Sequence, residues 1–324
     1  MSESKKTKLK IAIVGAGALG GTFGALLTDA GFDVHLVEID KRRVDAIKKN
    51  GIILHMPDGT IKTVKVKITD EPKTVGIVDI VQISVKGYHT HSAAKTALPM
   101  IGENTYVLSV QNGIGNLEVI ANVVGKEKVI GGVTAHSAMP ISFHEIKYAG
   151  GMGGIWIGRY DGKKDKRLEE MAKIFNEAGF TTEIIEGNVE IPIWRKLLAN
   201  VACNAVAAIT GFTGNQLLGC EHTRELIIKL AEETAEVAKA KGLEFDELNY
   251  AGAFVLKALS GVKDNKISML QDIEAKRRTE IDTLNGAIVR EGKKYGVATP
   301  YNETITYIIK SLEQKILWEL KGVI

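Results

Sequence analysis

The chain of 324 residues is long enough for about two domains, and its 45% apolar and 25% charged residues argue against both a disordered chain and a membrane-embedded one. Its 42 Lys and Arg against 39 Asp and Glu leave a formal net charge of +3, too small to indicate a nucleic-acid-binding surface. The sequence contains neither a long uninterrupted apolar stretch nor the apolar core of a signal peptide. We therefore expect a cytoplasmic protein without a membrane or nucleic-acid partner.

The first half of the chain alternates between predicted strands and predicted helices. Short apolar runs rich in β-branched residues predict strands over residues 8–14, 33–37, 78–85, 106–110 and 129–134. Helical spacing follows the first two strands, over residues 22–30 and 42–49, and each helix ends at a glycine. Residues 52–69 alternate around a Pro-Asp-Gly turn and predict a hairpin. This order of elements predicts an α/β fold in which a doubly wound parallel sheet is covered on both faces.

From about residue 187 onwards the pattern is helical only. Helical periodicity covers residues 194–208, 224–241, 247–259, 268–289 and 302–320, and no strand pattern interrupts it. We therefore predict a Rossmann-type dinucleotide-binding domain over residues 1–186 and an all-helical substrate-binding domain over residues 187–324. The long amphipathic helices of the second domain could also form a homodimer.

A glycine-rich loop follows the first predicted strand and opens the first helix. Its residues fit the pattern G-x-G-x-x-G and are Gly15, Ala16, Gly17, Ala18, Leu19 and Gly20. In this pattern the first glycine makes a tight turn, the second lets the backbone approach a pyrophosphate, and the third lets helix and strand pack closely. The helix N-terminus then directs free N–H groups and the positive end of its dipole at the phosphates. The position between a strand and a helix favours a dinucleotide-binding loop over a purely structural turn.

Glu38, at the end of the second predicted strand, bears on the choice of cofactor. A carboxylate there accepts hydrogen bonds from the adenosine ribose and repels a 2′-phosphate, which favours NAD(H). The run Lys41-Arg42-Arg43 supports NADP(H) as the alternative, because these cations could hold the phosphate, although they also suit a solvated first turn of a helix.

Three polar side chains share one face of the first helix in the second domain. Lys196, Asn200 and Asn204 are spaced four residues apart among Leu, Ala and Val residues. A lysine and two asparagines on an apolar helix are costly unless they are satisfied, so they indicate either a binding site or a partly exposed helix edge. A second polar group, over residues 268–286, would indicate a charged solvent face if it stood alone.

Nearly the whole chain resembles the ketopantoate reductase family (2-dehydropantoate 2-reductase). Of the motifs that carry the resemblance, the one at the glycine loop is generic to dinucleotide-binding folds, whereas the last four are specific in their order and spacing. The motifs are GAGALGG at residues 15–21, Lys86 after a buried strand, Gln111-Asn112-Gly113, W-x-K-x-x-x-N-x-x-x-N at residues 194–204, S-M-L-Q-D at residues 268–272, T-E-I-D-x-L-N-G at residues 279–286 and G-V-A-T-P at residues 296–300.

The resemblance implies roles for individual residues. The lysine that matches Lys196 is the general acid of the family, and the glutamate that matches Glu280 assists at the hydroxyl. Other matching residues hold the substrate or lie near it, and in this chain they are Asn200, Asn204, Asn265 and Ser268. Two further matches lie near the cofactor and the reacting centre, Lys86 and Asn112, and we expect Asn112 to contact both cofactor and substrate.

These residue types suit the reduction of a 2-keto acid. Hydride from C4 of a nicotinamide attacks the keto carbon, and an ammonium aimed at the carbonyl oxygen both stabilises the developing charge and protonates it. A nearby carboxylate keeps that ammonium charged. We expect Lys196 and Glu280 to face one pocket, with Ser268 on the same helix as Glu280. No metal is required by this chemistry, and His89 and His91 have no third ligand near them in the sequence.

The resemblance fixes the reaction more closely than the substrate. It implies the reduction of 2-dehydropantoate to (R)-pantoate, in pantothenate and coenzyme A biosynthesis. Some relatives are instead NAD-dependent D-2-hydroxyacid dehydrogenases that act on branched or aromatic 2-keto acids, and these provide the alternative. The family's usual cofactor is NADPH, often bound by an arginine just after the second strand, where this chain has Glu38-Ile39-Asp40. A non-catalytic dinucleotide sensor would need the glycine loop but not the lysine, asparagine and glutamate residues.

Overall fold

The structure of the chain is a computed structural model that describes residues 9–323, without the side chains of residues 152 and 153. The chain forms two compact units. The first comprises the chain up to Gln111 and the segment Asn116–Glu190, and the second comprises Asn112–Gly115 and the chain from Ile191 onwards. The sequence predicts a single division after residue 186, so Asn112–Gly115 is a part of the second unit that lies outside the predicted range.

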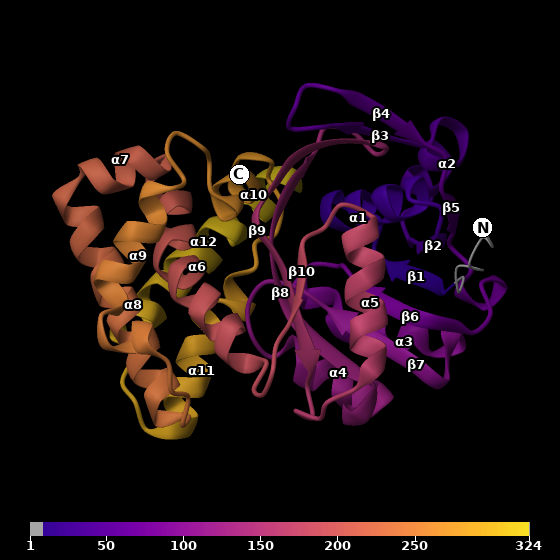
Figure 1. Cartoon of the computed structure of the whole chain (residues 1–324). Helices are drawn as coiled ribbons and strands as arrows, with labels where there is room; N and C mark the ends of the chain where they lie inside the picture. Colours follow the sequence, from indigo (N-terminus) through magenta and orange to yellow (C-terminus); the bar gives the residue numbers. More distant parts are fainter. Residues whose placement is uncertain (1–8, 324) are drawn as a thin grey trace. The chain divides into compact units, whose positions relative to one another are not determined.

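A ten-stranded sheet forms the centre of the first unit (Figure 1). The strands are β1 (Lys10–Val14), β2 (Asp33–Val37), β3 (Ile52–His55), β4 (Ile61–Val64), β5 (Lys67–Thr69), β6 (Val78–Ile83), β7 (Ile101–Ser109), β8 (Val129–Pro140), β9 (Glu145–Arg159) and β10 (Thr182–Ile184). Their order is β4-β3-β9-β8-β7-β6-β1-β2-β5, with β10 paired to β9. The described pairs are parallel, apart from β3 with β4 and β8 with β9. The doubly wound sheet predicted from the sequence is thus confirmed, and the predicted hairpin is the β3–β4 pair.

Both faces of this sheet are covered. Residues 11–13 of β1 are all fully buried, although successive side chains of a strand point to opposite faces. On one face Phe23 stacks on Phe180 at 4.5 Å between ring centroids and meets the edge of Phe175 at 5.7 Å. The helices of this unit are α1 (Ala18–Asp29), α2 (Lys41–Asn50), α3 (Thr90–Ala97), α4 (Asn116–Val124) and α5 (Lys166–Glu177). Because Phe23 belongs to α1 and Phe175 to α5, these two helices share a face of the sheet.

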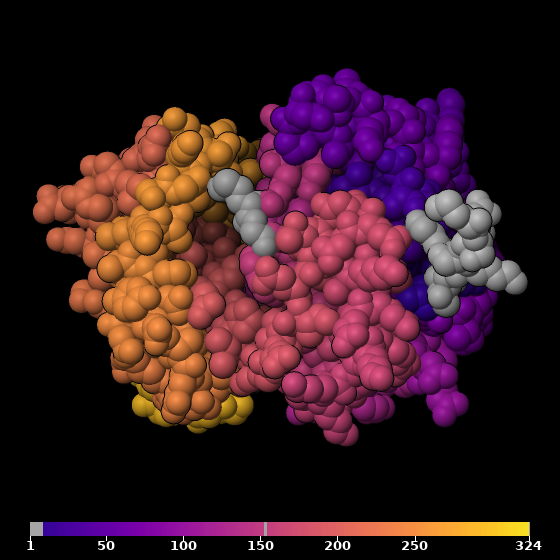
Figure 2. All heavy atoms as spheres, in the orientation of Figure 1, coloured from indigo at the N-terminus to yellow at the C-terminus, as the bar shows by residue number. Residues whose placement is uncertain are grey.

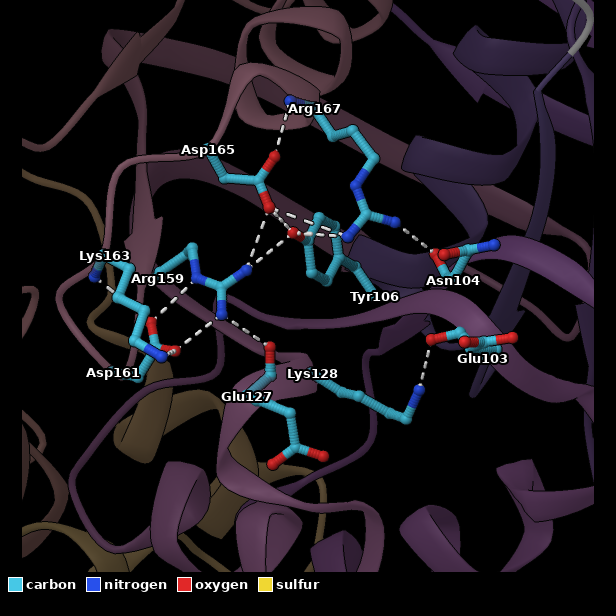
Figure 3. Close-up of polar contacts among 10 residues, drawn as sticks. All are labelled: Glu103, Asn104, Tyr106, Glu127, Lys128, Arg159, Asp161, Lys163, Asp165 and Arg167. Carbon is cyan, nitrogen blue, oxygen red and sulfur yellow. Dashed lines mark hydrogen bonds and ion pairs between the residues drawn. The ribbon is translucent and has the colours of Figure 1, made fainter.

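A polar network fastens Tyr106 of β7 and the end of β9 to the start of α5 (Figure 3). Arg159 donates hydrogen bonds to Asp161 at 2.6 Å, to Asp165 at 2.9 Å and to the Tyr106 hydroxyl at 2.7 Å. The guanidinium carbon of Arg167 lies 4.1 Å from the centroid of the Tyr106 ring. The hydrogen bond from Arg159 lowers the pKa of Asp161 to about 2, so this carboxylate stays charged in mild acid.

The second unit is helical, and its helices gather around α6 (Figure 1). They are α6 (Glu190–Thr210), α7 (Gly214–Gly219), α8 (Glu221–Ala240), α9 (Ala251–Ser260), α10 (Ser268–Glu274), α11 (Asn285–Tyr295) and α12 (Pro300–Leu320). Leu197, Val206 and Ala207 point to different sides of α6, yet each is at most 1% exposed. Figure 2 shows atoms of α8 and α9, in orange, on the near surface of this unit. Among the residues that the structure describes, no helix combines the length and the apolar character needed to cross a membrane.

The single helix predicted over residues 268–289 is wrong. α10 ends at Glu274 and α11 begins at Asn285, and between them Lys276 has a φ of +52°, which no α-helix contains. The backbone N–H and the hydroxyl of Thr279 both donate to one carboxylate oxygen of Glu313 in α12, each at 2.6 Å. This long-range contact stabilises a turn that helical periodicity cannot reveal. Ser268 and Glu280 therefore lie on different elements.

Candidate active site

The glycine-rich loop connects β1 to α1 in the first unit. Gly15 has a φ of +99°, and its N–H donates to the last carbonyl of β2 at 2.8 Å, so the chain turns sharply here. A side chain at Gly20 would begin 2.0 Å from the Gly15 carbonyl oxygen, so only glycine allows this close packing. Gly17 caps α1, whose first residues are Ala18 and Leu19, and nothing lies within 4 Å of where a Gly17 side chain would begin. The open space beside a helix N-terminus suits a pyrophosphate group.

Glu38 follows β2, and its carboxylate reaches back to the glycine loop. One oxygen accepts a hydrogen bond from the Ala16 N–H at 3.0 Å. The other accepts from the N–H groups of Ile39 and Asp40 at 2.8 and 3.1 Å. Lys41, the first residue of α2, is exposed. The loop and the carboxylate therefore form one surface, which is the arrangement that binds an adenosine ribose in dinucleotide-binding folds.

The two arginines that follow are held by carboxylates. Arg42 donates to Asp40 from Nε at 3.0 Å and from Nη2 at 2.8 Å. Arg43 donates to the Phe143 carbonyl at 3.0 Å, and its Nε lies 3.7 Å from the Glu38 carboxylate. Both guanidinium groups lie over the Phe143 ring, at 5.1 and 5.5 Å from its centroid. The charges of Arg42 and Arg43, two of the three cations that could bind a 2′-phosphate, are thus compensated within the chain.

Lys86 and Gln111 lie at the carboxyl ends of β6, which neighbours β1, and of β7, which is the next strand beyond β6. Lys86 is partly buried, follows β6 and precedes the 3₁₀ helix Gly87–His89. Gln111 follows β7, and its amide donates to the Val85 carbonyl at 2.7 Å and to the Thr90 hydroxyl at 3.0 Å. Because β1, β6 and β7 are adjacent and parallel, their carboxyl ends lie at one edge of the sheet. Lys86 and the glycine loop therefore lie at the same edge of the sheet. Nucleotides bind at this edge in doubly wound folds.

Lys196 of α6 carries the ammonium group of the second unit's polar cluster. Its Nζ donates to Asn112 Oδ1 at 2.8 Å. Burial lowers the pKa of Lys196 to about 8, and the negative charge of the buried Glu280 opposes this effect. The structure therefore brings Lys196, Asn112 and Glu280 together. An ammonium with a pKa near 8 is charged at neutral pH and still able to give up a proton, as a general acid requires.

Asn112 and Glu280 belong to two segments that are joined by a backbone hydrogen bond. The Ile114 N–H donates to the Thr283 carbonyl at 3.0 Å, and the Thr283 N–H donates to the Glu280 carbonyl at 3.0 Å. Gly113 has a φ of +84°, and a side chain there would begin 2.2 Å from the Thr283 carbonyl oxygen. The sequence contains the motif around Asn112 but gives no local sign of this contact, because the two segments lie far apart in the chain.

Further polar groups extend from Lys196 along α6. Asn200 is partly buried, and Asn204 is buried and donates from its amide to Ser268 Oγ at 3.4 Å. Ser268 is exposed at the start of α10. Asn265 is exposed in the turn after α9, where its amide donates to a carbonyl of the same turn at 3.0 Å, and its approach to a substrate stays a prediction. The asparagines on α6 and Ser268 offer neutral donors and acceptors on the lysine side of the helix.

The two histidines after β6 lie in exposed positions. His89 ends the 3₁₀ helix before α3, and His91 lies in the first turn of α3. Over residues 9–323, no group of three or more His, Cys, Asp or Glu residues is arranged to hold a metal ion.

Two family models match most of the chain. The family described as Ketopantoate reductase PanE/ApbA matches residues 11–162, and the family described as Ketopantoate reductase PanE/ApbA C terminal matches residues 188–313. The first match includes the glycine loop and Asn112, and the second includes Lys196 and Glu280. Both polar regions described above therefore lie within the matched segments.

Individual relatives are similar over almost their full length. The chain is 33% identical to the 2-dehydropantoate 2-reductase of Archaeoglobus fulgidus over 304 residues, which cover 94% of this chain and 98% of the relative. It is 35% identical to the 2-dehydropantoate 2-reductase of Aquifex aeolicus over 311 residues, which cover 94% and 97%.

Solved structures with two different named activities share the fold. The ternary structure of D-mandelate dehydrogenase with NADH and anilino(oxo)acetate has a TM-score of 0.88, with 28% identity over 95% of this chain and 99% of that one. The 2-dehydropantoate 2-reductase of Geobacter metallireducens has a TM-score of 0.87, with 30% identity over 94% and 99%. The fold is therefore common to both activities.

Proposed function

We propose, because this chain belongs to the ketopantoate reductase family, that it reduces 2-dehydropantoate to (R)-pantoate in pantothenate and coenzyme A biosynthesis. It is an NAD(P)H-dependent reductase of that family, so the non-catalytic sensor is set aside. The substrate is proposed because the relatives from Archaeoglobus fulgidus and Aquifex aeolicus, each more than 30% identical, are 2-dehydropantoate 2-reductases. The proposed mechanism depends on one observation. The Lys196 ammonium donates a hydrogen bond to Asn112, and the negative charge of Glu280 stabilises it.

Lys196 is the general acid in this proposal. A reduced nicotinamide, when bound, supplies the hydride to the keto carbon. As the carbonyl oxygen becomes negative, the Lys196 ammonium donates a proton to it, the carbonyl becomes a hydroxyl, and the lysine is left as a neutral amine. Asn112 orients the ammonium before the transfer, and Glu280 stabilises its charged form and can accept a hydrogen bond from the new hydroxyl.

The neutral polar groups beside the lysine hold the substrate. We assign the carboxylate and the distal hydroxyl of 2-dehydropantoate to the side chains of Asn200, Asn204 and Ser268, with Asn265 as a further group near the substrate. Amides and hydroxyls supply these hydrogen bonds without adding charge. The pKa of Lys196 then depends mainly on burial and on Glu280.

The cofactor is assigned to residues 15–20, Glu38 and Lys86 of the first unit, and NAD(H) is proposed as the preferred form. The contact of Asn112 with the cofactor, which the family resemblance implies, stays a prediction. The open space at Gly17, the adjacent helix N-terminus and the carboxylate of Glu38 fit a dinucleotide. NADP(H) is the alternative. Its 2′-phosphate would have to compete with Asp40 for Arg42 and with Glu38 for Arg43.

A second substrate class has specific support. D-mandelate dehydrogenase has the same fold at a TM-score of 0.88, and its ternary structure contains NADH. The alternative is therefore an NAD-dependent D-2-hydroxyacid dehydrogenase that acts on branched or aromatic 2-keto acids. The same lysine, glutamate and asparagine residues would serve that reaction.

The deciding experiment measures kcat/KM for 2-dehydropantoate, 2-ketoisovalerate and benzoylformate, each with NADH and with NADPH. We expect 2-dehydropantoate with NADH to give the highest value. A tenfold preference for benzoylformate would support the alternative. No oxidation of either cofactor with any 2-keto acid would contradict both assignments.

The choice of cofactor is tested with Glu38→Ala. Removing the carboxylate removes a ribose acceptor and a repulsive charge, so the ratio of kcat/KM for NADH over NADPH should fall by roughly tenfold, the value of one charge-assisted hydrogen bond. Asp58→Ala is the control, because Asp58 lies in the exposed turn between β3 and β4. A wild-type preference for NADPH of tenfold or more would contradict the proposal and assign cofactor choice to Lys41, Arg42 and Arg43.

The homodimer is proposed on the surface of α12. This helix exposes large apolar side chains, among them Tyr307, Trp318 and Leu320. Light scattering of the purified protein tests the assignment, and a monomer mass at micromolar concentration would contradict it.

A further inference from the structure

Asn112 reaches Lys196 from a short segment whose position depends on one carbonyl group. The Thr283 carbonyl accepts the hydrogen bond from Ile114, and at Gly113 a side chain would begin 2.2 Å from the carbonyl oxygen and 2.8 Å from the carbonyl carbon. Real side-chain atoms do not approach backbone atoms this closely. The segment can therefore close on Thr283 only because residue 113 is a glycine.

We propose that Gly113 is a positioning residue for the reaction: its lack of a side chain lets Asn112–Gly115 close on Thr283 and so holds Asn112 Oδ1 against the Lys196 ammonium. This inference rests on the proposed role of Lys196. The Thr283 N–H and hydroxyl donate to the Glu280 carbonyl at 3.0 and 3.2 Å. The same contact thus joins the segments that carry both partners of the lysine.

The turn at Thr283 is held from its other side, so it cannot easily move away from a larger residue 113. The N–H and hydroxyl of the buried Thr279 both donate to Glu313 at 2.6 Å, which ties the start of the turn to α12. Arg290 also donates to the Asp282 carbonyl at 2.7 Å. A methyl group at residue 113 should therefore displace Asn112–Gly115 and leave the turn in place.

Gly115 provides a matched comparison within the same segment. Its φ is +89°, close to the +84° of Gly113, so alanine is strained at both positions. Gly115 is exposed, and nothing lies within 4 Å of where its side chain would begin. The two glycines therefore share a conformational requirement, and only Gly113 has the close approach.

The first experiment compares Gly113→Ala with Gly115→Ala. Both should lower the melting temperature by a few degrees through the shared backbone strain, and Gly113→Ala should lower it further because it also displaces the segment. Only Gly113→Ala should lower kcat, by 10- to 100-fold. Its kcat/KM should also begin to fall at a lower pH, because an ammonium that loses the Asn112 acceptor is more easily deprotonated. Wild-type kcat and pH profile in Gly113→Ala, or the same losses in Gly115→Ala, would overturn the proposal.

A double-mutant cycle tests whether Gly113 acts through Asn112. Asn112→Leu removes the acceptor and keeps a similar volume. If the two changes act through one interaction, Gly113→Ala should add less than threefold to the loss of kcat already caused by Asn112→Leu. Fully multiplicative losses would contradict the proposed connection.

Two measurements do not depend on turnover. Lys196 can be labelled by reductive ¹³C-methylation and assigned by its absence in Lys196→Arg, and its NMR titration midpoint should fall in Gly113→Ala but not in Gly115→Ala. If the midpoint falls in Gly113→Ala but the wild-type protein reduces no 2-keto acid, the proposed function is refuted and the positioning role of Gly113 is upheld. An unchanged midpoint in an active enzyme would refute the positioning alone.

If Gly113→Ala does not fold, the contact of Asn112–Gly115 with Thr283 can be tested in the wild-type protein. The Ile114 amide should exchange with solvent at least tenfold more slowly than the Gly115 amide, because it donates to Thr283. Equal exchange rates would show that the segment does not close on Thr283 in solution, and would overturn the proposal.

Discussion

The glycine loop, residues 15–20, and the lysine cluster, formed by Asn112, Lys196 and Glu280, are built in opposite ways. The loop uses neighbouring residues and backbone groups, and its shape requires the absence of side chains at Gly15 and Gly20. The cluster uses side chains from separate segments, which backbone contacts bring to Lys196. The comparison indicates that substitutions in the loop act mainly through space for the backbone, whereas substitutions of the cluster's own side chains, Asn112, Lys196 and Glu280, act through charge and hydrogen bonding.

The largest expected effect is the loss of the general acid. Lys196→Met should lower kcat by about 10² to 10⁴, the usual contribution of a positioned proton donor, and should leave the Kd of the cofactor nearly unchanged. Lys239→Met on α8 is the matched control, because Lys239 is partly exposed and pairs with Glu236. Steady-state kinetics and cofactor fluorescence titration measure the two quantities. If Lys196→Met keeps more than about a third of kcat, Lys196 is not the acid.

Two glycines of the loop should separate binding from stability. Gly17→Ala meets open space, so the protein should fold normally, but the Kd of the cofactor should rise roughly 10- to 100-fold through loss of a close backbone contact with phosphate. Gly20→Ala meets the Gly15 carbonyl and should cost about 1–3 kcal/mol of folding free energy. Calorimetry and urea unfolding test the pair. Equal stability losses in both variants would contradict the assigned surroundings.

The cluster should also respond to pH, and the loop should not. Because the reaction needs the protonated Lys196, kcat/KM should fall as the pH rises through about 8. Glu280→Gln removes the negative charge that favours the ammonium, so the pKa of Lys196 should fall and the loss of activity should begin at lower pH. The pH dependence of kcat/KM in the wild type and the variant measures this shift. A shift to higher pH in Glu280→Gln would contradict the stated electrostatic effect.

The smallest effect concerns the first unit's framework, outside both regions. Asp161 has a folded-state pKa of about 2 against an ordinary value of 3.8, so its contribution to stability is complete above about pH 4 and is lost as the pH falls towards 2. Discounted for solvent screening, this contribution is about 1 kcal/mol. Urea unfolding at pH 5 and pH 3 measures it. Arg159→Met should flatten the pH dependence, and an unchanged slope in this variant would contradict the role of Arg159.

Local sequence signals were sufficient for the centre of the sheet. β2 occupies the predicted residues 33–37, because Val34, Leu36 and Val37 form a short apolar pattern between Gly31 and the polar residues from Glu38 onwards. β9 was not predicted, since Gly150 and Gly154 interrupt its apolar pattern and adopt positive φ angles. β10 has only three residues, two of them exposed, so it offers too little pattern to detect.

The candidate site was predictable by residue but not by architecture. The spacing along α6 gave the shared face of Lys196, Asn200 and Asn204, because one helix fixes that relation. Glu280 was expected on a helix with Ser268, and the contact of Thr279 with Glu313 explains why the chain turns there instead. Such tertiary contacts override local periodicity and leave no mark in the sequence around them.

The excursion of Asn112–Gly115 into the second unit limits how the protein can be divided. A fragment cut at residue 187 would lack the acceptor of the Lys196 ammonium and would leave the Thr283 carbonyl without the Ile114 N–H. A chimera that exchanges helical units between relatives would combine one protein's Asn112 segment with another's Thr283 turn. Recombinants should therefore retain activity best when residues 112–115 and the chain from residue 191 come from the same parent, although the two stretches are not contiguous in the gene.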